Sequence, residues 1–309
     1  MTLLFKSDLG RYDLWVPALK RHLEGREIRL WPDLGEVQDI EYALVWDPPP
    51  GLLASLPNLK AIFSVGAGVD HIAADPERPK HLPVIRMVEE GLTAGMTEYV
   101  VMQVLYHHRD MLAYRHQAAE KIWREIPAVP AHQRRIGILG LGVLGQDAAR
   151  MLVRFGFDVA GWSRTPKEIE GVTCFHGPEG LDQMLARTDI LVCLLPLTPA
   201  TRGILNGELF AKLPRGACLI NVGRGGHQVE RDLLEALDSG QLREATLDVF
   251  EEEPLPADSP LWSHPQVIVT PHIASMTMPE TAAKAVGENI KRMEAGLPPL
   301  NVVDFERGY

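Results

Sequence analysis

The stretch RIGILGLGVLG at residues 135–145 decides the fold. Its first five residues form an apolar run typical of a buried strand, and Gly140, Gly142 and Gly145 then complete the pattern G-x-G-x-x-G. Apolar residues at helical spacing follow, up to Gly156. Strand, glycine turn and helix in this order predict a unit that holds a pyrophosphate at the start of the helix. A glycine turn without a ligand is the alternative, and flavin or S-adenosylmethionine would also fit such a turn.

The segment AGWSRTPK at 160–167 bears on which dinucleotide binds. An NAD-binding unit should carry an acidic residue here, which bonds the ribose 2′-hydroxyl. Ser163, Arg164, Thr165 and Lys167 stand there instead, and Asp158 is expected at the start of the strand or in the loop before it, away from the strand's end. Hydroxyl groups and cations bind a 2′-phosphate, which a carboxylate would repel. We therefore predict NADP(H), with NAD(H) as the weaker alternative; otherwise the two cations only solvate a loop.

Short apolar runs separated by helix-length intervals extend along the whole chain, and they predict parallel sheets covered on both faces. One helix is expected over 97–117 and another over 279–296, with Gly296 past its end. The fold class is therefore α/β, with two doubly wound, Rossmann-like domains. The expected strands are 2–5, 28–31, 42–46, 61–65 and 84–87 in the first pattern, and 135–139, 158–162, 190–195, 217–222, 244–250 and 267–272 in the second.

Composition narrows the classes of function. The 309 residues carry a formal net charge of −10, which disfavours binding to nucleic acid. Cys174, Cys193 and Cys218 lie in apolar contexts without metal-ligand spacing, so we predict no metal and buried thiols in a reducing cytoplasm. No apolar run reaches the length of a membrane span, and we expect neither a signal peptide nor a membrane segment.

Three candidate catalytic residues follow predicted strands: Arg224 in NVGRG, Glu253 in LDVFEEEPLP and His272 in TPHIAS. Ligands of open α/β sheets bind beyond the carboxyl ends of the strands, so these side chains can converge. An arginine can hold and polarise a 2-oxo acid, and a histidine can donate the proton that hydride transfer to a carbonyl requires. A neighbouring carboxylate favours the imidazolium form. Taken singly, each residue also fits a surface charge or a structural role.

These motifs, with LPLTPATRGIL at 195–205, resemble the family of D-isomer-specific 2-hydroxyacid dehydrogenases in order and spacing. YALVWDPP, SVGAGVD at 64–70, EYVVMQVL, GWSRT, SPLWSHP and the final RGY are similar to its glyoxylate/hydroxypyruvate reductases of the A type. The resemblance implies that Arg224 orients the substrate, that His272 is the acid/base and that Glu253 is its partner. Glu251 or Glu252 could take that last role, although counting back from Pro254 favours Glu253.

The resemblance also implies a domain plan, in which residues 98–274 form an NADP-binding domain with a dimerisation segment. This domain is inserted into a flavodoxin-like substrate domain made of 1–97 and 275–309. The plan includes a homodimer and a small 2-oxo or 2-hydroxy acid as substrate. Trp123 would reach a partner subunit's site, or simply pack.

Further binding residues are transferred position by position. Asn221 is expected to support the loop of Arg224. Substrate-binding residues would be Trp46, Ala67, Gly68, Arg224 and His272. The residues that the resemblance and the glycine turn assign to the cofactor are Gly140, Gly142, Val143, Leu144, Gly145, Ser163, Arg164, Thr165, Lys167, Leu195, Pro196, Thr198, Val222, Gly223 and Asp248.

The resulting prediction is an NADPH-dependent reductase that converts glyoxylate to glycolate and hydroxypyruvate to D-glycerate, with His272 as proton donor. Another 2-hydroxyacid dehydrogenase of the same family is one alternative. A non-catalytic, dinucleotide-sensing scaffold is the other, from a different class of protein.

Overall fold

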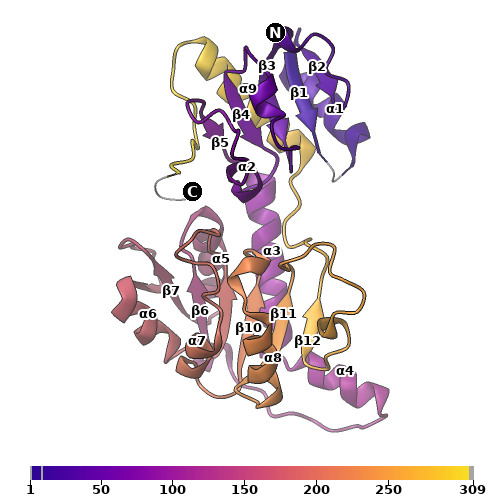
Figure 1. The fold of residues 1–309 in the computed structure, drawn as a ribbon. Coiled ribbons are helices and arrows are strands. Elements are labelled where there is room, and N and C mark those ends of the chain that lie inside the picture. Colours follow the sequence, from indigo (N-terminus) through magenta and orange to yellow (C-terminus); the bar gives the residue numbers. More distant parts are fainter. Residues whose placement is uncertain (1, 8–9, 306–309) are drawn as a thin grey trace. The chain divides into compact units, whose positions relative to one another are not determined.

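The computed structural model describes residues 2–7 and 10–305 and divides the chain into two compact units (Figure 1). Unit 1 comprises Met1–Leu92 and Met276–Tyr309, and unit 2 comprises Thr93–Ser275. Unit 2 is thus inserted into the chain of unit 1. Its first boundary, at 92/93, precedes the expected one at 97/98. Both positions lie within helix α3 (Glu90–His108), which runs from unit 1 into unit 2 without a break. Which unit binds substrate and which binds cofactor stays a prediction, and RGY at 307–309 lies outside the described residues.

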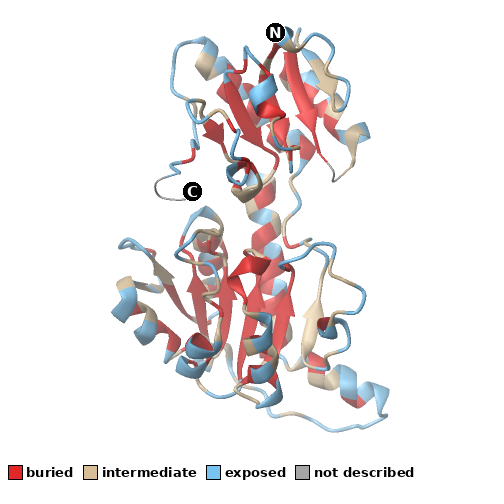
Figure 2. Ribbon diagram, viewed as in Figure 1, coloured by how far each residue is buried: buried red, intermediate tan, exposed pale blue. Residues whose placement is uncertain are grey.

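Unit 1 contains a parallel sheet in the order β2-β1-β3-β4-β5, the order of flavodoxin-like domains. Alternate residues of each strand point to opposite faces, so that Leu3 and Phe5 pack with α1 and α9 while Leu4 packs with α2. Burial on both faces explains the nearly continuous apolar runs (Figure 2). The elements are β1 (Thr2–Lys6), α1 (Tyr12–His22), β2 (Glu27–Leu30), β3 (Ile40–Val45), β4 (Ala61–Ser64), α2 (Asp70–Ala73), β5 (Val84–Ile85) and α9 (Pro279–Glu294).

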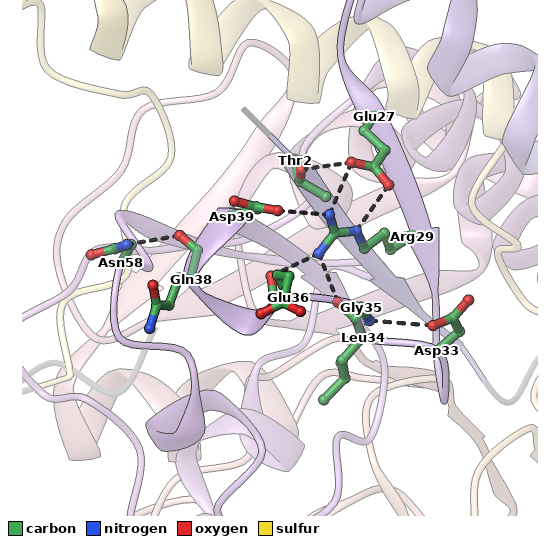
Figure 3. A network of polar contacts seen from close by, with 10 residues as sticks. All are labelled: Thr2, Glu27, Arg29, Asp33, Leu34, Gly35, Glu36, Gln38, Asp39 and Asn58. Atoms are coloured by element: carbon green, nitrogen blue, oxygen red, sulfur yellow. Dashed lines mark hydrogen bonds and ion pairs between the residues drawn. The ribbon is translucent and has the colours of Figure 1, made fainter.

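A network of polar contacts lies at the edge strand β2 of this sheet (Figure 3). The Arg29 guanidinium forms ion pairs with Glu27 and Asp39, at 2.9 and 3.0 Å. It also donates to the carbonyl oxygens of Leu34 and Glu36, at 2.8 and 2.7 Å. One side chain thereby ties the segment between β2 and β3 to the edge strand.

Unit 2 contains a parallel sheet in the order β12-β11-β10-β9-β6-β7-β8. Helices α3 and α5 pack on one face and α6, α7 and α8 on the other. This is the dinucleotide-binding order with an added strand, and the direction of the strand order reverses between β6 and β9. The elements are α4 (Met111–Ala119), β6 (Arg135–Leu139), α5 (Val143–Arg154), β7 (Asp158–Ser163), β8 (Val172–His176), α6 (Gly177–Leu185), β9 (Ile190–Cys193), α7 (Gly207–Lys212), β10 (Ala217–Asn221), α8 (Glu230–Asp238), β11 (Leu242–Leu247) and β12 (Val267–Val269).

The expected fold class is confirmed, but the helix expected over 97–117 is wrong in its bounds. The Glu89 carboxylate accepts hydrogen bonds from the N–H groups of Gly91 and Leu92, so α3 already begins at Glu90. At its end, Asp110 adopts a φ of 53°, which breaks the helix before α4 begins.

The strand β8 was not predicted, because it forms an edge of the sheet and three of its residues, Val172, Cys174 and Phe175, are only partly buried. The helix expected at the end of the chain is confirmed as α9, with Gly296 beyond it at a φ of 70°. Among the described residues, none of the helices combines the length and the apolar character that a membrane crossing requires.

Candidate active site

Loops that follow the strands of the unit 2 sheet carry nearly all the predicted cofactor and catalytic residues. They lie after β6, β7, β9, β10, β11 and β12. Because these strands are parallel, their carboxyl ends share one edge of the sheet. The reversal of strand order between β6 and β9 places the glycine turn at the centre of that edge, where doubly wound sheets bind their ligands.

The glycine turn connects β6 to α5. Gly140 has a φ of +102°, and a Cβ there would lie 2.7 Å from the Leu194 carbonyl oxygen. A Cβ on Gly145 would come within 1.9 Å of the Gly140 carbonyl oxygen. At Gly142, by contrast, a Cβ would meet nothing within 4 Å. Gly140 and Gly145 therefore serve the turn itself, whereas Gly142 leaves open space beside the helix start, which Val143 and Leu144 begin.

This arrangement fits a dinucleotide. Open space at Gly142 allows a pyrophosphate to approach the backbone, and the first N–H groups of α5 have no acceptor within the helix. Val143, which is about half exposed, borders the same space.

The end of β7 lies beside this turn, because Trp162 pairs with Leu139 of β6. Ser163 ends the strand, and its hydroxyl donates to the Thr165 carbonyl at 2.7 Å. Arg164, Thr165 and Lys167 are exposed. Asp158 is the first residue of the strand rather than part of the preceding loop, and it pairs with Arg187 at the opposite end. No acidic residue stands between Trp162 and Lys167.

The loops after β9 and β10 are joined by His227, which sequence analysis missed. The N–H of Arg224 donates to His227 Nδ1 at 3.0 Å, so the other ring nitrogen carries the hydrogen. That Nε2 lies 3.3 Å from the carbonyl oxygen of Pro196, in the segment that also contains Leu195 and Thr198. The only signal in the sequence was a histidine three residues after the arginine.

The backbone of Arg224 is also held by Asn221, at the end of β10. The Asn221 amide donates to the Arg224 carbonyl at 3.1 Å, and its oxygen accepts from Gly223 N–H at 3.2 Å. Asn221 is fully buried, and Val222 and Gly223 are buried as well. The guanidinium Nη1 donates to the Gly223 carbonyl at 2.8 Å. The loop is thus fixed through its backbone, whatever the arginine side chain contacts.

His272 and Glu253 form an ion pair, with Nδ1 and Oε2 2.7 Å apart and about a third of each side chain exposed. The other oxygen of Glu253 accepts from the Phe250 N–H at 2.9 Å. Burial alone raises the pKa of Glu253. The hydrogen bonds from His272 and Phe250, with the charges of His272 and Arg224, outweigh that effect and hold the pKa below its usual value. The pair therefore contains a carboxylate at neutral pH.

The two other glutamates of the acidic run do not contact this histidine. Glu251 forms an exposed ion pair with Arg202 at 2.9 Å, and Glu252 is exposed. The structure places Glu253 alone of the three against His272.

Asp248 follows β11 and is buried, with 1% of its surface exposed. Its carboxylate accepts hydrogen bonds from the Thr270 hydroxyl and from the N–H groups of Ile273 and Ala274, at 2.6, 2.9 and 2.8 Å. Burial raises the pKa of Asp248, and these hydrogen bonds oppose the effect. Asp248 thus organises the loop that carries His272, and its predicted contact with a nicotinamide stays a prediction.

In unit 1, the candidate substrate residues follow β3 and β4. Trp46 contacts His71, with ring centroids 4.4 Å apart and ring planes tilted by 44°, and packs against Gly66, where a Cβ would lie 2.7 Å from the indole. The Ser64 hydroxyl donates to the Gly68 carbonyl at 2.8 Å and accepts from Gly66 N–H at 3.2 Å. This small turn contains Ala67, and among the residues that the structure describes no acceptor faces the N–H groups of Ala67 and Gly68.

Trp123 lies outside the helices and strands of unit 2 and is 99% exposed. Nothing in the described chain packs on it, so its predicted reach into a partner subunit stays a prediction.

Residues 101–274 match the family model of the "D-isomer specific 2-hydroxyacid dehydrogenase, NAD binding domain". The chain therefore belongs to the family of D-isomer-specific 2-hydroxyacid dehydrogenases. It is 46% identical to glyoxylate/hydroxypyruvate reductase A of Yersinia enterocolitica, over all of both chains.

Solved structures give the same result for the fold. A D-isomer-specific 2-hydroxyacid dehydrogenase from Xanthobacter autotrophicus, in complex with NADPH and MES, has a TM-score of 0.96 at 47% identity, over 100% of this chain and 99% of that one. An NADPH-dependent glyoxylate/hydroxypyruvate reductase from Sinorhizobium meliloti, in complex with NADP and sulfate, has a TM-score of 0.95 at 45% identity, over all of both chains.

Two alanine substitutions should separate the roles of the glycines. Gly142→Ala should leave the melting temperature unchanged, because its Cβ meets no protein atom, yet raise the Kd for NADPH at least tenfold by filling the space of the pyrophosphate. Gly145→Ala should lower the melting temperature as well, since its Cβ meets backbone. Thermal unfolding and titration calorimetry measure both quantities, and a Gly142→Ala protein that binds NADPH normally would contradict the assignment.

Replacing Glu253 by glutamine should move the basic limb of the pH–rate profile to lower pH by about one unit or more. Glu253 is ionised at neutral pH because its pKa is lowered, so the substitution removes the negative charge that favours the His272 imidazolium. Glu251→Gln and Glu252→Gln are the matched controls and should leave the limb in place. A shift of the limb in either control, or no shift in Glu253→Gln, would contradict the assignment of Glu253 as the partner of His272.

Proposed function

We propose that this chain is an NADPH-dependent reductase of small 2-oxo acids, which converts glyoxylate to glycolate and hydroxypyruvate to D-glycerate. Its family performs oxidoreductase chemistry on 2-hydroxy acids, and two of the relatives named above, from Yersinia enterocolitica and Sinorhizobium meliloti, are glyoxylate/hydroxypyruvate reductases. The observation that carries the proposal is the ion pair of His272 and Glu253, at the strand edge that holds both the glycine turn and Arg224.

Residues of unit 2 account for the preference for NADP(H). Gly140, Gly142 and Gly145 would hold the pyrophosphate at the start of α5. Ser163, Arg164, Thr165 and Lys167, at the end of β7, would bind the 2′-phosphate. No carboxylate stands at this position to repel it. Two related structures contain NADPH or NADP, in agreement with this reading.

The side chains of this protein hold the substrate and supply a proton. Arg224 would bind the substrate carboxylate and polarise the 2-oxo group through its planar guanidinium. Since Glu253 occupies Nδ1 of His272, Nε2 is the nitrogen that would give its proton to the carbonyl oxygen. Glu253 stabilises the imidazolium before that transfer. When bound, NADPH would supply a hydride to C2, so that the carbonyl would become a primary alcohol in glycolate and a secondary alcohol in D-glycerate.

Unit 1 would contribute to the binding of the substrate. The N–H groups of Ala67 and Gly68 have no described acceptor, and successive N–H groups in a turn can bind a carboxylate. Trp46, packed on Gly66, would limit the size of the substrate.

The direct test is a steady-state assay of NADPH oxidation with glyoxylate, hydroxypyruvate, a branched 2-oxo acid and 3-phosphohydroxypyruvate. We expect turnover with the first two, and kcat/KM for NADPH above that for NADH. Turnover confined to the larger acids would indicate another activity of the same family. A folded protein that binds NADPH but reduces none of them would favour the scaffold, and a preference for NADH would contradict the assignment of the β7 residues.

We also propose that the protein is a homodimer in the cytoplasm. A groove on α3 and α4 is lined by Met102, Leu105, Tyr106 and Met111, and two of these, Met102 and Met111, are among the exposed large apolar residues. Exposed apolar patches of this kind favour association. The three cysteines are unpaired, as in proteins of reducing compartments. Analytical ultracentrifugation should give twice the mass of one chain, and a monomer would contradict the dimer.

A further inference from the structure

A row of buried polar side chains lies between α3 and β11 in unit 2. Tyr99, Gln103 and His107 are four residues apart and so share one face of α3. Glu244, Thr246 and Asp248 alternate along β11 and the position after it, and so share one face of the sheet. All six are buried within an otherwise apolar core. We call these residues, together with Thr270, the polar seam.

Hydrogen bonds connect the members of the seam. His107 Nδ1 lies 2.8 Å from Glu244 Oε2, and its Nε2 lies 2.9 Å from the Thr246 hydroxyl. Thr246 in turn donates to the Gln103 side-chain oxygen at 3.3 Å. Gln103 lies one helical turn after Tyr99 on the same face of α3.

The seam ends at the His272 loop. The Tyr99 hydroxyl lies 2.6 Å from the Thr270 hydroxyl, and Thr270 donates to Asp248 at 2.6 Å. The helix α3 is therefore linked to Asp248 through two hydroxyl groups.

Between His107 and Asp248, the hydrogen bonds of the seam are all donated in one direction, toward Asp248. Thr270 has a single hydroxyl hydrogen, which it gives to Asp248, so the Tyr99 phenol must donate to Thr270. Burial raises the pKa of Tyr99 to about 12, which keeps the phenol protonated. At the other end, Thr246 gives its hydrogen to Gln103, so His107 must donate to Thr246.

His107 then donates from both ring nitrogens, as an imidazolium. Burial opposes that charge, but Cys218 and Glu244 raise the pKa of His107 to about 9. A cation thus lies at the His107 end of the seam, and the Asp248 carboxylate lies at the other end.

Asp248 fixes the backbone of His272 and of the two residues that follow it. Its carbonyl oxygen accepts from His272 N–H at 2.9 Å, and its carboxylate accepts from Ile273 and Ala274 N–H. His272 itself has a φ of 53°, a conformation that L-residues other than glycine seldom adopt. The orientation of the imidazole toward Glu253 therefore depends on how firmly Asp248 is held.

We propose that the polar seam positions His272, with Tyr99 and Thr270 as positioning residues that act through Asp248. The seam holds the loop at 270–274 so that the imidazole keeps its contact with Glu253 and faces the reacting carbonyl. This inference rests on the proposed function of His272 as proton donor. Neither Tyr99 nor Thr270 touches the substrate in this account.

A metal ion is the rival explanation for one end of the seam. Ligand atoms of His107, Cys218 and Glu244 lie within 4.8 Å of one another. However, the Arg243 guanidinium lies 3.4 Å from the Cys218 sulfur, and this permanent charge would repel a second cation. Both nitrogens of His107 already have hydrogen-bond partners as well. The hydrogen-bonded seam accounts for the contacts of His107.

The test is Tyr99→Phe, which removes one hydroxyl group, with Tyr106→Phe as its matched control on the same helix. The Tyr106 hydroxyl is buried without a hydrogen-bond partner among the described residues, so its removal leaves the exposed apolar lining of the groove on α3 and α4 in place. In Tyr99→Phe we expect kcat for glyoxylate to fall roughly tenfold, as the loss of one buried hydrogen bond allows. The basic limb of the profile should move to lower pH, because the imidazolium is held less firmly against Glu253. The KM for NADPH should stay unchanged, and Tyr106→Phe should behave as the wild type.

Substitutions at Thr270 complete the cycle. Thr270→Ser keeps the hydroxyl and should retain most of the activity, whereas Thr270→Val removes it and should lose at least as much as Tyr99→Phe. The double variant with Tyr99→Phe should be no worse than Thr270→Val alone, since Tyr99 acts through Thr270. If Thr270→Val does not fold, the kcat values of Thr270→Ser and Tyr99→Phe still test the proposal, because only Tyr99→Phe should lose most of its activity. Additive losses, or an unchanged pH profile in Tyr99→Phe, would overturn the proposal.

An NMR titration of the histidine Cε1–H resonances separates this proposal from the proposed function. The His272 resonance, assigned from the spectrum of His272→Gln, should titrate at lower pH in Tyr99→Phe than in Tyr106→Phe. If that difference is found in a protein that turns over no 2-oxo acid, the proposal that the seam positions His272 stands and the proposed function is rejected. If the protein is active and His272 titrates alike in both variants, the proposed function stands and the proposal that the seam positions His272 is rejected.

Discussion

His272→Gln is expected to lower kcat for glyoxylate roughly 10²–10⁴-fold, the range that general acid–base catalysis contributes. The glutamine amide is not acidic enough to transfer a proton to the carbonyl oxygen at neutral pH. The loop itself should persist, because Asp248 holds it through backbone N–H groups at 273 and 274 and not through the imidazole. The KM for NADPH should therefore change little. The residual activity should also lose the basic limb of its pH profile.

Steady-state and single-turnover assays measure this loss, and His132→Gln is the control. His132 is an exposed histidine of the same unit, before β6. It should show wild-type kinetics. An His272→Gln protein that keeps more than about a tenth of the wild-type kcat would mean that another group, or water, supplies the proton.

Arg224→Lys is expected to lower kcat/KM for glyoxylate by roughly a hundredfold, since hydrogen bonds to charged groups contribute about 1.5–3 kcal/mol each. Lysine keeps the charge but not the planar fork that contacts a carboxylate and a neighbouring carbonyl together. The loop should keep its shape, because Asn221 and His227 bind the Arg224 backbone. The Kd for NADPH should therefore stay close to that of the wild type.

Arg202→Lys is the control for this change of side chain. Arg202 carries the same charge, but its exposed ion pair joins it to Glu251. Its substitution should leave kcat/KM within about twofold, as exposed pairs contribute little. If Arg224→Lys had an equally small effect, Arg224 would not be the residue that orients the substrate.

The features that followed from the sequence depend on short segments and on a simple property of parallel sheets. The glycine turn, its strand and its helix are contiguous, so their pattern predicted them. Arg224 and His272 each follow a strand, and the carboxyl ends of parallel strands share one edge of the sheet. The absence of an acid after Trp162 is likewise visible in the sequence alone.

The features that did not follow depend on contacts between distant segments. Tyr99 and Thr270 are 171 positions apart, and no local pattern predicts that their hydroxyl groups meet. His227 matters because it lies between the Arg224 loop and Pro196. Similarly, Asp110, where the helix breaks between α3 and α4, forms an ion pair with Arg243 of β11, which is far away in the sequence. Tertiary packing, rather than propensity, decides such positions.

A crystal structure of this protein with NADP+ and oxamate, an unreactive 2-oxo acid analogue, tests the central claim most directly. It should show the Arg224 guanidinium and Nε2 of His272 within hydrogen-bond distance of the analogue, at roughly 2.6–3.2 Å, beside the nicotinamide. Glu253 should remain on Nδ1 of the same imidazole. An analogue bound away from these side chains, or an Arg224 or His272 that points elsewhere in the complex, would contradict the account.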